Sequence, residues 1–258
     1  MNMFVDANSV VPDKQAQIWA CLQSVTDPEL DESVVELKFV TNADVDADNH
    51  VHIGFRLPTY WCAANFSFLM ADDMRQAVQT LDWVTGVTVI LGEHMYADKI
   101  NAGLSQGLSF QDTFGSEADG NLDDIRQTFL VKAFQRRQVT LLNYLTANGY
   151  LADQLIELTL SDLECLPLEA EGEKLVRRYF ERRHVVGPIR PDAFAFITSE
   201  GAALESETYA AYVTGLRRIG VNAEFNGALC RGLLAVRFDL DTPYVPSGEK
   251  PEMSQTAV

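Results

Sequence analysis

The sequence predicts an α+β fold in which a small mixed domain precedes a mainly helical domain. Residues 14–92 alternate between segments with helical periodicity and short β-rich segments, whereas residues 121–183 are dominated by helical sequence. The chain of 258 residues is 47% apolar and 22% charged, as expected of a globular protein with a sizeable core.

The first domain is predicted to run in the order helix, strand, strand, helix, strand. Apolar residues at helical spacing, Ile18 and Leu22 among them, predict the first helix, and a β-rich run after a Pro-containing turn predicts the first strand. An acidic turn at residues 41–50 separates that strand from its hairpin partner. The expected elements are a helix over residues 14–25, strands over 34–40 and 51–57, a helix over 63–83 and a strand over 87–91.

The second half is expected to be helical after a linker. Residues 92–120 are rich in Gly, Ser, Asp and Asn, which predicts a surface loop, and Asn121 is a suitable N-cap for a helix that ends at Gly149. The segment GEKLVRRYFERR predicts another helix, and AFAFIT, ESETYAAYVTGLRRIG and GLLAVRFDL predict a strand-helix-strand appendix. The expected divisions are a disordered N-terminus (1–12), the first domain (13–100), a linker (101–120), the mainly helical domain (121–243) and a disordered tail (244–258).

Charge and hydropathy exclude two classes of partner. The net charge is −17, and residues 1–100 hold 15 Asp and Glu against 5 Lys and Arg, so the surface is expected to repel nucleic acid. No apolar run approaches the ~20 residues of a membrane helix. The N-terminus has no basic segment followed by an apolar stretch, and we therefore expect a cytoplasmic protein. The sequence is compatible with a homodimer formed through an exposed sheet edge, but it does not require one.

Cys62 is the most informative of the four cysteines, which include no C-x-x-C pair. It lies in RLPTYWCAANFSFLMADDMR, residues 56–75, between a Pro-Thr turn and the predicted second helix. Unpaired N–H groups and the helix dipole favour an anion such as a thiolate at a helix start. The alternative is that Cys62 packs as a small apolar residue beside Trp61.

Two motifs together resemble a known family. The acidic turn and β-rich run DPELDESVVEL, followed by a strand, a Pro-Thr loop, a lone cysteine and a helix, resemble iron-sulfur cluster assembly factors of the SufT and PaaD type. The resemblance covers roughly residues 13–92. It implies a functional role for Cys62 and places Asp27 and Glu29 in the acidic turn of the family.

The sequence also departs from the family pattern. Lys38 stands where the family commonly has glycine, and Ala63 stands where a proline is frequent. The C-terminal cysteine cluster of the PaaD branch is missing. The longer chain is similar to accessory proteins of bacterial soluble di-iron monooxygenases, especially the propane-oxidising type. This similarity implies a client metalloenzyme, either the di-iron hydroxylase or its iron-sulfur reductase.

Further residues are candidates for the site or for a partner surface. His94 follows the closing strand and is expected to approach the Cys62 loop, and Cys230 offers a second thiolate if the domains close on each other; buried packing is the alternative for Cys230. Arginine pairs on the helices predict a basic docking strip for a partner, or else solvated salt bridges. They are Arg136, Arg137, Arg177 and Arg178.

Three functions are weighed. The first is a non-enzymatic maturation factor in which Cys62 transiently binds iron or an iron-sulfur cluster, with Asp27, Glu29, His94 and Cys230 as further candidate ligands. The second is a metal-free assembly chaperone for the hydroxylase. The third, a thiol enzyme, lacks a sequence signature for its base, and G-x-S-x-G, Walker A, G-x-G-x-x-G and H-E-x-x-H are all missing. We expect the protein not to be an enzyme.

Overall fold

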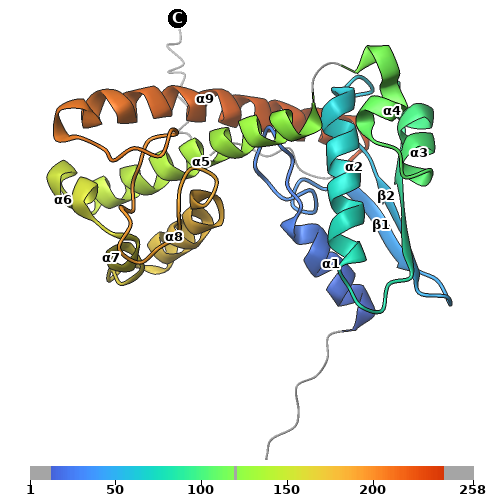
Figure 1. Ribbon diagram of the computed structural model, residues 1–258. Coiled ribbons are helices and arrows are strands. Elements are labelled where there is room, and N and C mark those ends of the chain that lie inside the picture. The colour runs from blue at the N-terminus through green and yellow to red at the C-terminus, as the bar shows by residue number, and fades with distance from the viewer. Residues whose placement is uncertain (1–12, 119–120, 241–258) are drawn as a thin grey trace, which may run out of the picture.

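The computed structural model describes residues 13–118 and 121–240, and its fold is α+β (Figure 1). The first part has the predicted order: α1 (Lys14–Ser24), β1 (Val40–Val45), β2 (His50–Phe55), α2 (Ala64–Gln79) and β3 (Gly86–Leu91). The predicted fold class is therefore confirmed. The predicted disordered ends, residues 1–12 and 244–258, lie outside the described residues.

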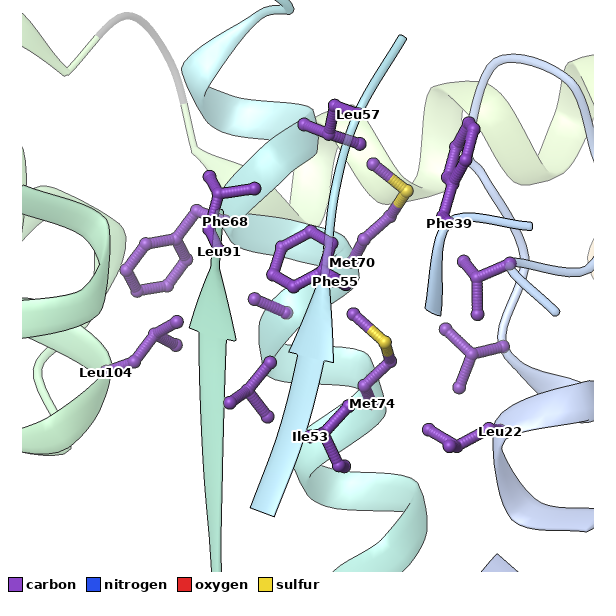
Figure 2. Packing of buried hydrophobic residues seen from close by; sticks show 14 of the residues in the cluster. Leu22, Phe39, Ile53, Phe55, Leu57, Phe68, Met70, Met74, Leu91 and Leu104 are labelled. Atoms are coloured by element: carbon purple, nitrogen blue, oxygen red, sulfur yellow. The ribbon is translucent and has the colours of Figure 1, made fainter. Parts of the chain in front are cut away.

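The three strands form one sheet in the order β1-β2-β3, with β1 antiparallel and β3 parallel to β2. The helix α2 is the crossover between the two parallel strands. Figure 2 shows Met70 and Met74 of α2 packed beside Phe55 and Ile53 of β2, and all four side chains are at most 2% exposed. The buried face of α2 therefore positions its N-terminus, and with it Cys62, at one end of the sheet.

The first strand begins later than predicted. Val34, Leu37 and Phe39 are buried, but residues 34–38 form a turn in which the N–H of Leu37 donates to Ser33 O at 2.9 Å. Lys38 has a φ of 59°, a left-handed conformation in which glycine is least strained, as the glycine common in related sequences suggests. Apolar content alone does not separate a buried turn from a buried strand, so the expected strand over 34–40 was wrong.

The acidic segment expected as a turn instead supplies β1. Its pairing with β2 aligns Val45 with Val51 and Ala43 with Ile53. The hairpin closes at Asp46, whose Oδ1 accepts the N–H groups of Asp48 and His50 at 2.9 Å. Turn chemistry at the end of the acidic segment therefore leaves its first residues free to pair as a strand.

The segment expected as a loop or linker is largely helical. It contains α3 (Ala97–Ser105), α4 (Phe110–Phe114) and the 3-10 helix η1 (Gly115–Glu117). Its apolar side chains belong to the first core: Ile100, Leu104, Phe110 and Phe114 are at most 8% exposed. The i, i+4 spacing of these side chains outweighs the Gly-, Ser- and Asp-rich composition on which the expectation of a loop rested.

The second part is helical, as predicted. Asn121 caps α5 (Leu122–Ala147) by accepting the N–H of Asp123, and the segment GEKLVRRYFERR lies in α8. The predicted strand GLLAVRFDL was wrong, because α9 continues through it to Arg237, and AFAFIT forms only isolated bridges. A short apolar run fits a buried helix as well as a strand. The remaining helices are α6 (Ala152–Glu157), α7 (Leu160–Glu164), α8 (Ala170–Arg183) and α9 (Ser206–Arg237).

Two hydrophobic clusters form the cores, and α9 enters both. The first cluster gathers the side chains of α1 to α4 and the sheet, and the second those of α5 to α9. Val213 and Leu216 of α9 belong to the second cluster, whereas Leu234, 2% exposed, belongs to the first. Figure 1 shows α9 lying alongside α5 and running from the helical region towards the first domain. Within residues 13–118 and 121–240, no helix has both the length and the apolar content to cross a membrane.

Candidate functional site

Cys62 stands two residues before α2, at the end of the loop that leaves β2. Its Sγ lies 3.1 Å from the hydroxyl oxygen of Thr59, and the residue is half-buried. The N-cap residue of α2 is Ala63, which offers no side-chain acceptor to the first turn. The Pro-Thr turn thus places a thiol two residues before the helix start, where Asn65 Oδ1 accepts the N–H of Phe66 at 2.8 Å.

His94 holds the backbone of the Cys62 loop. Its Nε2 lies 2.8 Å from the carbonyl oxygen of Cys62, and its Nδ1 accepts the N–H of Tyr96 at 3.2 Å. Because Nδ1 accepts, the proton is assigned to Nε2. Burial lowers the pKa of His94, with the bond to Cys62 opposing this and Arg237 adding to it, so the neutral ring is favoured. Metal ligation by His94 would require one of these two bonds to break, and the geometry gives it a positioning role.

Replacing His94 tests this positioning role. His94→Phe is expected to lower the free energy of unfolding by about 1–3 kcal/mol, because the Cys62 carbonyl and the Tyr96 N–H lose their partner. Urea unfolding of both proteins measures the difference. The matched control is His52→Phe, at a side chain that is 51% exposed, where we expect a change of less than about 0.5 kcal/mol. Equal losses in the two variants would contradict the role given to His94.

The acidic turn is rigid and its first carboxylate is buried. Asp27 is 9% exposed, and its Oδ1 accepts the N–H groups of Glu29 and Leu30 at 2.9 and 2.7 Å. Burial raises the pKa of Asp27 to about 6; the charge of Glu29 adds to this rise, and the two backbone bonds and Arg136 oppose it. The turn therefore keeps a carboxyl group that titrates near neutral pH.

Three of the arginines predicted as a docking strip bind this turn of their own chain, and Arg178 among them donates to the carbonyl oxygen of Asp31 at 3.3 Å. Arg137 is 8% exposed and donates to Asp31 from Nε at 2.6 Å and from Nη2 at 2.9 Å. Arg136 donates to the carbonyl oxygen of Glu29 at 2.5 Å. The buried carboxylate of Asp31 attracts both guanidinium groups, which therefore bind within their own chain, and the docking role predicted for Arg136 and Arg137 stays a prediction. Arg177 and Arg178 are exposed, and a docking role for them stays a prediction.

The C-terminal half of α9 lies across both the acidic turn and the Cys62 loop. Asn226 donates to Glu29 Oε1 at 2.9 Å, and Arg231 donates to Glu32 at 2.7 Å. Further along the helix, Arg237 donates to the carbonyl oxygens of Leu57 at 3.2 Å and of Glu93 at 2.9 Å. These contacts dock α9 on the first domain at two points on either side of Cys230.

The structure brings Cys230 together with three predicted site residues. Burial raises the pKa of the Cys230 thiol to about 11, the charges of Asp27, Cys62 and Glu29 add to the rise, and Arg231 opposes it. Both cysteines are half-buried and pack against the first core. Among the described residues, no group of three or more His, Cys, Asp or Glu side chains is arranged to hold a metal ion. The candidate site is thus the thiol of Cys62, with the acidic turn and Cys230 within electrostatic range of each other.

Sequence reasoning missed the residues that assemble this site. Asp31 and Arg137 are 106 positions apart, and Asn226 and Glu29 are 197 apart, so no local pattern links them. The available signal was the combination of an acidic turn with several arginines on later helices. That combination indicates electrostatic attraction between the turn and the later helices, but it does not predict which carboxylate pairs with which arginine.

Comparison with known proteins bears on the first domain. None of the curated proteins compared with the chain gave a match. The family model described as iron-sulfur cluster assembly protein matches residues 15–89, a span that includes Asp27, Glu29 and Cys62. Residues 15–89, less than a third of the chain, are therefore similar to iron-sulfur cluster assembly proteins, and this similarity supports a general role in iron-sulfur cluster assembly.

Proposed function

We propose that this protein is an assembly factor that holds iron or an iron-sulfur cluster transiently at Cys62 and passes it to a client metalloenzyme. The observation that carries the proposal is the half-buried thiol of Cys62 within residues 15–89, with Thr59 contacting its Sγ and His94 bonding its carbonyl oxygen. Thiolates are the ligands that iron-sulfur clusters require. In this role the protein does no chemistry of its own on an organic substrate.

The small number of ligands favours delivery over storage. An iron-sulfur cluster is usually held by four thiolates. Within the described residues, no His, Cys, Asp or Glu group of three or more is arranged for a metal ion, so the residues do not fit a resident cluster. A cargo held by one or two protein thiols keeps positions open for ligands from the client.

The surface around Cys62 supports docking of a protein client. Tyr60, Trp61 and Met95 are 52%, 73% and 49% exposed, and the N–H of Met95 donates to Tyr60 O at 2.8 Å, which joins their two loops. Aromatic residues and methionine are enriched at protein interfaces. We propose a di-iron monooxygenase system as the client, either its hydroxylase or its reductase, on the resemblance of the full chain to accessory proteins of such systems.

Anaerobic reconstitution with iron and sulfide tests the proposal. Wild type and the matched control Cys165→Ser, altered at an exposed cysteine, are expected to retain bound iron and visible absorption after desalting. Cys62→Ser is expected to retain at least about tenfold less iron, because the transient ligand is lost. Thermal unfolding of the three proteins checks that the fold is intact. Equal iron retention by wild type and Cys62→Ser would refute the role of Cys62.

The exposed aromatic surface also favours a second function, a metal-free assembly chaperone. In that case Trp61, at 73% exposure, contacts the client while the neighbouring thiol only packs at the interface. Wild type would then bind the client without iron. Client maturation would tolerate Cys62→Ser and fail with Trp61→Ala.

A further inference from the structure

We propose that a basic cleft between the acidic turn and the helices α5 and α8 binds an acidic peptide segment of the client. The inference rests on the proposed function and deepens it, because it names the chemistry by which the partner is recognised. The cleft is separate from Cys62, which lines neither of its cavities. It gives the helical region, outside residues 15–89, a direct part in binding the client.

The basic cleft consists of two adjoining cavities. Their volumes are about 370 Å³ and about 730 Å³, and they share five lining residues, Asp31, Arg137 and Arg178 among them. The described residues that line them include six of the chain's 20 Lys and Arg but only four of its 37 Asp and Glu. The six are Arg136, Arg137, Lys174, Arg178, Arg182 and Arg231, and the four are Asp31, Glu32, Glu36 and Glu181. The cleft is therefore a basic region in a protein whose net charge is −17.

Half of these cations are already neutralised by ion pairs within the chain. They are Arg137 and Arg182, paired with Asp31, and Arg231, paired with Glu32. The other three, Arg136, Lys174 and Arg178, form no ion pair with a carboxylate that the structure describes, and the two arginines donate to backbone carbonyl oxygens instead. Of the four lining carboxylates, Glu36 alone has no ion pair among the described residues. Three such cations against one such carboxylate leave positive charge for a ligand to neutralise.

The placement of the three cations fits an extended peptide better than a small anion. Arg136 lines the smaller cavity, Lys174 the larger one and Arg178 both, so a ligand must pass through both cavities to meet all three. Lys174 and Arg178 are one helical turn apart on α8, which separates their Cβ atoms by about 6 Å. In an extended peptide, side chains two residues apart share one face at a spacing of about 6.6 Å. Two carboxylates of such a segment therefore match this pair, whereas the acidic surface repels a long phosphate backbone.

Fluorescence anisotropy of a labelled hexaglutamate peptide, titrated with the full chain at low ionic strength, tests the inference. We expect wild type to bind this peptide but not a labelled hexaglutamine, and binding should weaken as salt is added. Lys174→Ser and Arg178→Ser are each expected to weaken binding about 3–5-fold, as for the loss of an exposed ion pair, and the double variant by about tenfold or more. The matched control is Arg177→Ser, at the next residue of the same helix, which is 67% exposed and lines neither cavity. It should bind like wild type.

The outcomes separate the inference from the proposed function. If wild type does not bind hexaglutamate, or if Lys174→Ser and Arg178→Ser both bind it like Arg177→Ser, the basic cleft is not the docking site. Displacement of the peptide by an equal concentration of inorganic phosphate, or equally tight binding of a single-stranded RNA, would also overturn the inference. Thermal unfolding checks that each variant is folded, and Lys174→Ser is the second variant in case loss of the bond between Arg178 and Asp31 loosens the turn. All of these variants should retain iron at Cys62 after reconstitution, so failure of the cleft leaves the role of Cys62 standing.

Discussion

Asp31→Asn is expected to lower the free energy of unfolding by about 3–5 kcal/mol, because it removes one member of a buried ion-pair network. The Asp31 and Arg137 side chains are 5% and 7% exposed, and Arg182 also binds Asp31 at 3.1 Å. Without the carboxylate, Arg182 loses this counter-charge, and Arg137 keeps only the exposed Glu181, at 2.6 Å. Asparagine tolerates the left-handed φ of 53° at this position, so the loss reports the charge rather than backbone strain.

Urea unfolding at pH 7 measures this effect. The control is Asp192→Asn, at a side chain that is 82% exposed, where we expect less than about 0.5 kcal/mol. Adding Arg137→Met to Asp31→Asn should recover part of the stability, because it removes a buried guanidinium group that has lost its buried carboxylate partner. If Asp31→Asn and the control cost the same, the network does not stabilise the contact between the acidic turn and the helical region.

Asp27→Asn is expected to have the opposite effect and to raise stability at pH 7 by up to about 3 kcal/mol. Burial raises the pKa of Asp27 from 3.8 to about 6, so between these values the folded protein binds a proton that the unfolded chain has released. Stability in wild type therefore falls as pH rises from about 4 to about 6. Asparagine carries no charge, and its side-chain oxygen still accepts the N–H groups of Glu29 and Leu30.

The difference in unfolding free energy between Asp27→Asn and wild type, measured across pH 4 to pH 7, checks this prediction. We expect the difference to grow through the window in which Asp27 ionises and to level off above it. Asp48→Asn, at an exposed position, serves as the control and should leave the profile of wild type unchanged. Parallel profiles for wild type and Asp27→Asn would contradict the raised pKa. A carboxylate retained at a cost in stability is typical of a functional position.

Local patterns predicted the parts of the fold that local interactions decide. The periodicity of Ile18 and Leu22 gave α1, and the N-cap preference of Asn121 gave the start of α5. The errors occurred where an apolar segment fits two structures. Leu37 and Phe39 are buried in turns as well as they would be in a strand, and Leu234 reaches the first core from a helix.

In the candidate site, too, sequence reasoning predicted what neighbouring residues decide and missed the contacts between distant residues. The positions of Cys62 and the acidic turn follow from neighbouring residues, and sequence reasoning located both. Which carboxylate the arginines bind depends on which one is buried. Sequence reasoning did not single out Asp31, which Arg137 and Arg182 bind. The contacts of Arg237 with Leu57 and Glu93 require α9 to continue to its last residue, where a strand over residues 232–240 was expected.

The passage of α9 through both cores has a mechanical consequence. A helix of 32 residues extends about 48 Å, and it is stiff over that length. Val213 and Leu216 pack in the second core, whereas the C-terminal half of the helix is bonded to Glu29, Leu57 and Glu93 of the first domain. A partner that tilted the helical region would therefore carry these contacts with it, because a continuous helix transmits a rotation along its whole length.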